Sequence, residues 1–372
     1  MDEDLYRSLQ RHLDRMPVPF PATESGVELS LLRRLFSPED ARLALLLGMI
    51  PEPLATIHRR AGRKTSKDAL SAALDDMAAR GLIQRVTTKR GPLYGKAPLV
   101  IGFYESQVNR LTPEFQRDVE RYGDEGFSEA LAAQTPQLRT VPINQPIPFE
   151  RVVGRYDDIR AFVRASPGPF AVMNCICQQG KDLLGQPCRQ THDREHCLTI
   201  GAAAESLAGR GTARFITKDE TLAFLDRADG EGLVVEPQNT QDPIFICCCC
   251  GCCCGVLTAA KKLPRPVAAF ATNYHAAVDA AACNACLACE GRCQMGAIAC
   301  DEGSAAVSLD RCIGCGLCVT TCPTSAIALV MKPDAHLPPK DMARLYGRMY
   351  RERFGLAGLA EAIGRRLVGA KQ

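Results

Sequence analysis

The most constraining feature of this chain is a cysteine pattern that occurs twice, 29 residues apart. Residues 283–293 read CNACLACEGRC and residues 312–322 read CIGCGLCVTTC, and an Ala-Ile pair follows each copy. Each copy supplies four thiols, the number that one cubane iron–sulfur cluster needs. Two C-x2-C pairs can also bind a structural zinc. The regular repeat of all eight cysteines, with Pro323 after the last, favours iron–sulfur clusters over zinc.

The repeat resembles a bacterial-type ferredoxin domain with two [4Fe-4S] clusters. Its second copy, CIGCGLCVTTCP, matches the C-x2-C-x2-C-x3-C-P run in full, and its first copy departs at Gln294, where the pattern has proline. The resemblance implies that the fourth cysteine of each copy serves the other cluster. It assigns to the first cluster Cys283, Cys286, Cys289 and Cys322. It assigns to the second cluster Cys312, Cys315, Cys318 and Cys293.

A second stretch, FICCCCGCCCG at residues 245–255, has seven cysteines in eight consecutive positions. In an extended strand Cys247 and Cys249 would face one side, and Cys248 and Cys250 the other, so one cluster cannot use them all. The two glycines let the run fold back, since glycine adopts positive φ readily. The two Cys-Cys-Gly triplets resemble the signatures of heterodisulfide-reductase-type proteins, in which paired cysteines bind a noncubane cluster.

Four more cysteines precede this run, and a third [4Fe-4S] cluster is the simplest use for them, alone or shared with the run. A thiol–disulfide redox centre and another thiophilic metal are the alternatives. His192 and His196 could replace a thiolate, although such residues are more often solvated. Cys300 is expected to have no ligand role. The candidate metal ligands of this region are Cys175, Cys177, Cys188, Cys197, Cys247, Cys248, Cys249, Cys250, Cys252, Cys253 and Cys254.

The N-terminal sequence and the hydropathy pattern predict a cytoplasmic protein. The first sixteen residues are acidic and then apolar at helical spacing, unlike a signal peptide. The chain has no run of eighteen apolar residues, so we expect no transmembrane segment. In a reducing compartment the 20 cysteines are expected to bind metal or to act in redox chemistry, because disulfides are rare there.

Helical periodicity within residues 1–130 predicts helices over 40–49, 53–61 and 66–80, followed by strands at 82–86 and 93–94. This order resembles a winged helix-turn-helix of the MarR type. The segment 56–96 has ten Lys or Arg against three Asp. Such a charge suits phosphate contacts, but the predicted recognition helix also contains Asp68, Asp75 and Asp76, which would repel DNA.

The predicted organisation is an α+β multidomain chain. Residues 131–150 contain four prolines and predict a linker, and a capping box at Thr217–Glu220 predicts a helix within the cysteine-rich region. At the C-terminus, Met342, Leu345 and Met349 begin an apolar helical stripe. We expect that stripe to pack on the protein itself or on a second copy, with a redox partner or an acidic membrane surface as alternatives. The five segments are a helical region at 1–130 with the winged helix, the linker at 131–150, the cysteine-rich region at 151–263, the ferredoxin-like domain at 270–332 and a C-terminal helical segment at 338–372.

Taken together, these features resemble multidomain 4Fe-4S binding proteins of bacteria and archaea. Several clusters, with no nucleotide, flavin or pyridoxal-phosphate motif, predict an electron-transfer protein or oxidoreductase subunit that passes electrons between partner proteins. A redox-sensing transcriptional regulator is the second interpretation. The third is a reductase whose active centre lies at Cys247–Cys254.

Overall fold

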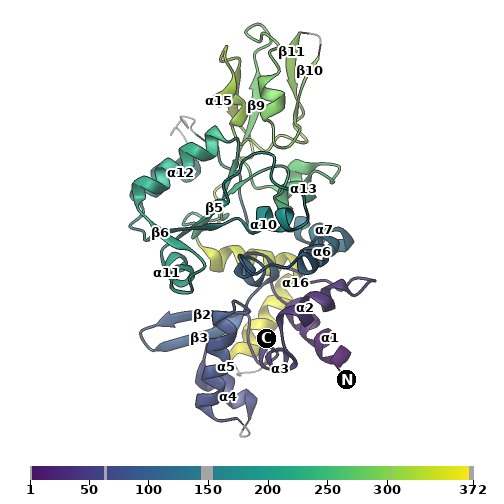
Figure 1. The fold of residues 1–372 in the computed structure, drawn as a ribbon, viewed down its shortest axis with the longest axis vertical. Coiled ribbons are helices and arrows are strands. Elements are labelled where there is room, and N and C mark those ends of the chain that lie inside the picture. Colours follow the sequence, from purple (N-terminus) through teal and green to yellow (C-terminus); the bar gives the residue numbers. More distant parts are fainter. Residues whose placement is uncertain (1, 63–64, 144–153, 302, 368–372) are drawn as a thin grey trace. The chain divides into compact units, whose positions relative to one another are not determined.

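The computed structural model of the protein describes residues 2–62, 65–143, 154–301 and 303–367 (Figure 1). These residues form two compact units: unit 1 is Met1–Gln134 with Tyr346–Gln372, and unit 2 is Thr135–Leu345. Helices and strands occur together in the chain, so the predicted mixed class is confirmed. Among the described residues, no helix is both long enough and apolar enough to cross a membrane.

Unit 1 is mainly helical, and its helices pack around buried side chains such as Leu9, Leu31, Phe36 and Phe103. Its α-helices are α1 (Asp2–Leu13), α2 (Val27–Leu35), α3 (Pro38–Ala44), α4 (Leu54–Ala61), α5 (Lys67–Ala79), α6 (Pro113–Tyr122), α7 (Ser128–Ala132) and most of α16 (Met342–Leu367). Single turns of π or 3-10 helix are η1 (Leu99–Phe103), η2 (Glu105–Gln107) and η3 (Gly123–Phe127).

Helix α5 forms where the sequence predicts it. The Ser66 side chain accepts a hydrogen bond from the Ala69 N–H at 3.1 Å and caps the helix start, and Leu70, Leu74 and Met77 are fully buried. A hairpin of β2 (Ile83–Thr88) and β3 (Gly91–Lys96) follows, and β1 (Glu52–Pro53) pairs with β3. These strands form a small sheet in the order β1-β3-β2.

Unit 2 contains a five-stranded antiparallel sheet in the order β6-β4-β5-β8-β7. Its strands are β4 (Phe170–Asn174), β5 (Glu195–Ile200), β6 (Arg214–Ile216), β7 (Val234–Pro237) and β8 (Phe245–Cys249). The helices of this part are α8 (Gly154–Asp157), α9 (Ile159–Ala165), α10 (Ile176–Leu183), α11 (Ala202–Gly209), α12 (Lys218–Gly230) and α13 (Gly255–Ala260). The predicted capping box is present, since Thr217 and Glu220 each accept a backbone N–H of the other.

The rest of unit 2 contains the repeated cysteine pattern. Strands β9 (Tyr274–Val278) and β12 (Ile327–Met331) pair with each other, as do β10 (Ile298–Asp301) and β11 (Ser304–Val307). The short helices are α14 (Ala288–Arg292) and α15 (Leu317–Thr321), preceded by the turn η4 (Pro266–Ala269). One continuous apolar core joins this part to the five-stranded sheet, from Val234 and Ile246 to Met295 and Ile313.

Part of the predicted linker lies along unit 2. The backbone N–H groups of Arg139, Val141 and Ile143 donate to the carbonyls of Pro237, Val235 and Cys315 respectively. Residues 144–150 of that linker, and 368–372 of the predicted C-terminal segment, lie outside the described residues. Backbone hydrogen bonds of the segment 138–143 therefore connect strand β7 to the second cysteine loop.

Candidate iron-sulfur and metal sites

The backbone conformation repeats at the same 29-residue spacing as the cysteines. Three pairs of equivalent positions have positive φ, a conformation that residues other than glycine rarely adopt. The pairs are Ala285 (54°) with Gly314 (66°), Leu287 (65°) with Gly316 (79°), and Gly296 (58°) with Ser325 (54°). Two similar loops are therefore built from two different sequences. At Gly314 a side chain would meet the Tyr274 carbonyl oxygen at 2.3 Å, so only glycine fits there.

Backbone N–H groups point at equivalent sulfurs in the two copies. Ala276 in β9 donates to the Cys312 Sγ at 3.4 Å, and Ala305 in β11 donates to the Cys283 Sγ at 3.4 Å. Both donor and acceptor positions differ by 29 residues. Hydrogen bonds to sulfur stabilise a thiolate and are one determinant of the potential of an iron–sulfur cluster.

Three thiols of the repeat lie in surroundings that disfavour a free thiolate. Burial raises the pKa of Cys315 well above its ordinary value and that of Cys318 to about 12, and the nearby Cys293 adds to both shifts. Cys293 thus interacts electrostatically with Cys315 and Cys318. Burial, with a contact to Cys300, raises the pKa of Cys289 to about 11. Such thiols ionise when a metal compensates the charge.

The seven-cysteine run is divided among a strand, a turn and a helix start. Cys247, Cys248 and Cys249 end strand β8, residues 251–253 form a turn, and Cys254 is the N-cap of α13. Because side chains alternate along a strand, Cys248 faces the opposite side of the sheet from Cys247 and Cys249. The run therefore directs its thiols to different places.

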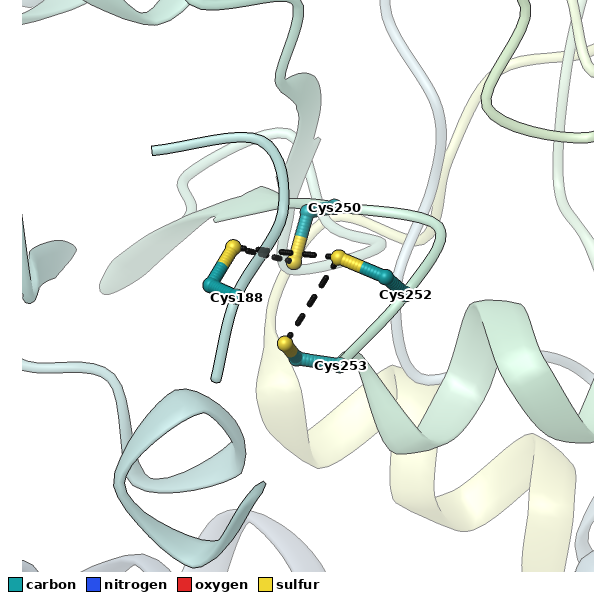
Figure 2. A group of neighbouring side chains, drawn as sticks. All are labelled: Cys188, Cys250, Cys252 and Cys253. Carbon is teal, nitrogen blue, oxygen red and sulfur yellow. Dashed lines mark hydrogen bonds between the residues drawn. The ribbon is translucent and has the colours of Figure 1, made fainter. Parts of the chain in front are cut away.

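One group of thiols, which we call the four-thiol site, consists of Cys188, Cys250, Cys252 and Cys253 (Figure 2). Its four Sγ atoms all lie within 4.8 Å of one another. The Cys188 sulfur is 3.6 Å from that of Cys250 and 3.7 Å from that of Cys252, and the Cys252 and Cys253 sulfurs are 3.7 Å apart. Cys188 is 62 residues from Cys250 in sequence, so the site depends on the tertiary fold.

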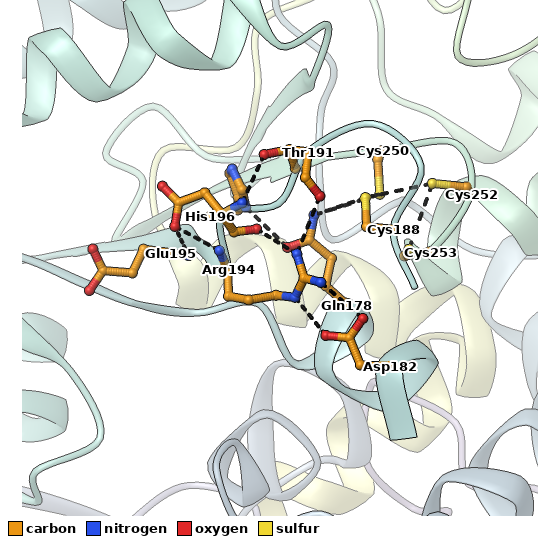
Figure 3. Close-up of polar contacts among 11 residues, drawn as sticks. Gln178, Asp182, Cys188, Thr191, Arg194, Glu195, His196, Cys250, Cys252 and Cys253 are labelled. Carbon is orange, nitrogen blue, oxygen red and sulfur yellow. Dashed lines mark hydrogen bonds and ion pairs between the residues drawn. The ribbon is translucent and has the colours of Figure 1, made fainter. Parts of the chain in front are cut away.

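Polar side chains lie on one side of the four-thiol site (Figure 3). The Gln178 amide donates to the sulfurs of Cys188 at 3.5 Å and Cys250 at 3.9 Å. The His196 ring contacts the Gln178 carbonyl oxygen at 3.0 Å through Nδ1 and the Glu231 carboxylate at 3.1 Å through Nε2. Both ring nitrogens have protein partners, so His196 orients Gln178 and is not placed as a ligand. His192 is exposed.

The second group, which we call the sheet-face thiols, lies on one side of the five-stranded sheet. Glu236, Cys247 and Cys197 are opposite one another on strands β7, β8 and β5. Each sulfur shifts the pKa of its neighbour, so the sulfurs interact in one continuous row. In order along this row the sheet-face thiols are Cys175, Cys177, Cys254, Cys249, Cys247 and Cys197.

Glu236 adds a carboxylate to the sheet-face thiols, and the sequence analysis missed it. Its carboxylate lies within 4.8 Å of the Cys249 and Cys254 sulfurs, and it is fully buried. Burial raises its pKa to about 8, although hydrogen bonds from Cys249 and Thr140 lower it in part. One carboxylate oxygen has no hydrogen-bond partner among the described residues. A charged residue inside the apolar run LVVEP was the signal that could have identified it.

Outside the repeat, two cysteines belong to neither group. Cys248 is buried, and burial raises its pKa well above the ordinary value. Cys300 is half-buried and contacts Cys289.

Comparisons with known proteins identify an iron–sulfur domain in this part of the chain. The family described as a 4Fe-4S binding domain matches residues 305–328, which include the second copy of the repeat. Proteins named "Electron transport protein HydN" from Escherichia coli K12 and O157:H7 are 32% identical over 120 residues. The match covers 32% of this chain and 62% of each relative, so it spans less than two thirds of their length. No solved structure matches this chain. Iron–sulfur cofactors are thus supported.

Proposed function

We propose that this protein is an iron–sulfur electron-transfer protein, or an electron-transfer subunit of an oxidoreductase. The observation that carries the proposal is the repeat of cysteines, positive-φ positions and N–H···S hydrogen bonds at one fixed spacing. The 4Fe-4S family match and the similarity to electron transport proteins support it. Redox partner proteins would supply and accept the electrons.

The proposed ligands of the first cluster are Cys283, Cys286, Cys289 and Cys322, and those of the second are Cys312, Cys315, Cys318 and Cys293. The donor set fits such clusters, since all eight proposed ligands are thiols and backbone N–H groups donate to the Cys312 and Cys283 sulfurs. When bound, a [4Fe-4S] cluster accepts and returns one electron. Ala276 and Ala305 stabilise the thiolate charge through their N–H groups.

We place a further iron–sulfur cluster at the sheet-face thiols. Six thiols and Glu236 exceed what a single metal ion needs, and the unpartnered carboxylate oxygen of Glu236 is a buried acceptor that a metal would satisfy. Cys197, Cys247 and Cys249 lie on neighbouring strands of the sheet, which give a rigid support that a redox centre requires.

The test is the metal and sulfide content of anaerobically purified protein. We expect about twelve iron atoms and about twelve sulfides per chain in clusters, because three [4Fe-4S] clusters contain that number. A content near eight iron atoms and eight sulfides would contradict the proposed sheet-face cluster and would be explained by the ferredoxin-type pair alone. In the reduced protein, Cys312→Ser should alter one member of the interacting pair in the EPR spectrum. A spectrum without any cluster signal in the wild type would overturn the electron-transfer function.

For unit 1 we propose a winged helix-turn-helix that docks on a partner protein. Helices α3, α4 and α5, followed by the β2–β3 hairpin, support that arrangement. The Asp75 carboxylate is 2.7 Å from the Arg85 guanidinium, and Arg80 pairs with both Asp76 and Asp40 at 2.7 Å. Because these arginines already have carboxylate partners, fewer positive charges are available for DNA phosphates. DNA-binding regulation is therefore the alternative to docking on a partner protein, and an experiment below tests it.

A further inference from the structure

The sulfur spacing of the four-thiol site suits a single metal ion. For a tetrahedral ion with metal–sulfur bonds of about 2.3 Å, geometry places the sulfurs about 3.8 Å apart. Three pairs of the site lie at 3.6, 3.7 and 3.7 Å, and all four sulfurs are within 4.8 Å of one another. A cubane cluster separates its four thiolates more widely, because each binds a different iron.

We propose that Cys188, Cys250, Cys252 and Cys253 bind one tetrahedral divalent metal ion, zinc or iron, and not a cubane in addition to the three proposed above. All four ligands come from the protein, so the ion has no open position for substrate and its role is structural. It would hold the loop at Cys188 against the turn at Gly251. This proposal does not depend on the ferredoxin-type pair.

The surroundings of the four sulfurs support a closed tetrathiolate site. Gln178 donates to the Cys188 and Cys250 sulfurs, and His196 fixes the orientation of that amide. Backbone N–H groups of Gln190 and Thr191 also donate to Cys188. Partners that hydrogen-bond to metal ligands fix their orientation and are a regular part of metal sites.

Nearby cations offset the charge of the site. A divalent ion with four thiolates has an excess of two negative charges, which must be compensated where Cys250 and Cys253 are buried. Lys261 interacts electrostatically with Cys250 and Cys252, and its ammonium donates to the Gly251 carbonyl at 2.7 Å. Arg194 interacts with Cys188 and Cys253. Lys261 and Arg194 thus both contribute positive charge near the thiolates, Arg194 while it is also paired with Asp182 at 2.6 Å.

The experiment compares full-length Cys253→Ala with the matched variant Cys248→Ala. Cys248 is in the same run and is equally buried, but it belongs to neither thiol group. Both proteins are purified anaerobically, and their zinc, iron and acid-labile sulfide are measured. We expect Cys253→Ala to lose about one metal ion per chain and no sulfide, because a tetrathiolate ion contains no inorganic sulfur. Cys248→Ala should keep the wild-type content.

Loss of about four irons together with about four sulfides from Cys253→Ala would overturn the proposal and indicate a cubane. Unchanged metal content would overturn it as well. If Cys253→Ala does not fold, the wild-type protein gives the answer. X-ray absorption at the zinc edge should show four sulfurs at about 2.3 Å, or Mössbauer spectra should show an iron outside any cluster. Absence of both signals contradicts a single ion.

Failure of the single-ion proposal and failure of the proposed electron-transfer function give different experimental results. Failure of the single-ion proposal leaves the iron and sulfide of the ferredoxin-type pair in place. Failure of that function would instead appear as the absence of cluster EPR signals, whatever the four-thiol site binds.

Discussion

The side-chain oxygen of Gln294 accepts a hydrogen bond from the backbone N–H of Gly251 at 2.7 Å. Gln294 is the residue at which the first cysteine copy departs from the ferredoxin pattern, and Gly251 divides the seven-cysteine run. Cys293 precedes one partner, and Cys250 and Cys252 flank the other. This contact therefore joins the ferredoxin-like part to the four-thiol site within unit 2.

Gln294→Pro tests the importance of this contact by restoring the ferredoxin pattern. The variant removes the acceptor for Gly251 and also the bond from Gln294 to Gln190 at 3.1 Å. We expect a loss of unfolding free energy of about 1 kcal/mol, because a half-buried N–H loses its protein acceptor. Urea titration under anaerobic conditions measures it. Gln294→Glu keeps the oxygen and is the control; equal losses in both variants would contradict the role of the acceptor.

Gly251→Ala should perturb the four-thiol site directly. An added side chain would approach the Gln294 carbonyl oxygen to 2.3 Å and the Lys261 ammonium to 2.6 Å, and the backbone oxygen cannot move away easily. We expect destabilisation of about 1–3 kcal/mol or more and partial loss of one metal ion. Thermal unfolding and metal analysis are the measurements.

Gly255→Ala is the matched control for that prediction. Nothing lies within 4 Å of a side chain added at Gly255, which is the first residue of α13. Alanine favours a helix by up to about 1 kcal/mol over glycine, so this variant should be as stable as the wild type or more so. Equal destabilisation by both changes would show that space at Gly251 is not the cause.

The cysteine repeat was predictable from sequence because local spacing alone defines it. The alternation of Cys247 and Cys249 against Cys248 was also predictable, since strand geometry fixes it. The division of the remaining run was not. Cys250 leaves the strand and joins Cys188 from a distant loop, and only the packing of α10 and β5 brings that loop near. Glu236 was missed for the same reason, because its importance comes from its neighbours on β8.

Lys96 should make the stability of unit 1 depend on pH. It is 2% exposed, its ammonium donates to the His12 carbonyl at 2.9 Å, and burial lowers its pKa to about 7. Between pH about 7 and about 10.5 the unfolded chain keeps a proton that the folded chain releases. Stability should therefore rise with pH in that window, by up to about 1.4 kcal/mol per pH unit. Below pH about 7, Lys96 is protonated in both the folded and the unfolded chain, and the folded protein bears the full free-energy cost of burying its charge.

The measurement is a series of urea titrations of wild type and Lys96→Met across this pH range, with thiols kept reduced. Subtracting the two profiles removes the contributions of other titrating groups that the variant shares. The wild type should gain stability relative to the variant as pH rises. Parallel profiles would show that Lys96 keeps its ordinary pKa in the folded protein.

DNA binding is predicted to be absent or weak. The exposed basic residues Lys89 and Arg90 lie in the β2–β3 turn, but Asp75 and Asp76 on α5 pair with two other arginines of this segment, Arg85 and Arg80. Gel shifts with DNA from upstream of the gene, in oxidised and reduced protein, test this. A retarded complex would favour a DNA-binding regulator over a docking domain if two conditions hold. The complex must weaken steeply with salt, and it must be lost in the double variant Lys89→Ala, Arg90→Ala.

Arg60 shows why the charge of this segment overstates its affinity for phosphate. Its guanidinium lies 2.6 and 2.7 Å from the two Glu52 carboxylate oxygens, and both side chains are buried. Arg60→Ala should therefore lower the unfolding free energy by about 3–5 kcal/mol, because Glu52 would be left buried without its partner. Thermal unfolding checks the loss. A variant as stable as the wild type would mean that Glu52 takes up a proton or reaches water.

Removal of the chain after Leu337 should destabilise unit 1. Within unit 1, helix α16 buries Met349 completely, and the Arg353 guanidinium donates to the backbone oxygens of Asp14 at 2.8 Å and Met16 at 2.6 Å. Loss of one such side chain removes about 1.5–3 kcal/mol of burial. We expect a lower melting temperature and increased binding of a hydrophobic dye. Leu356→Ser is the control, because Leu356 is 72% exposed and should matter little. A truncated protein with unchanged stability that fails to accept electrons would instead make α16 a docking element for a redox partner.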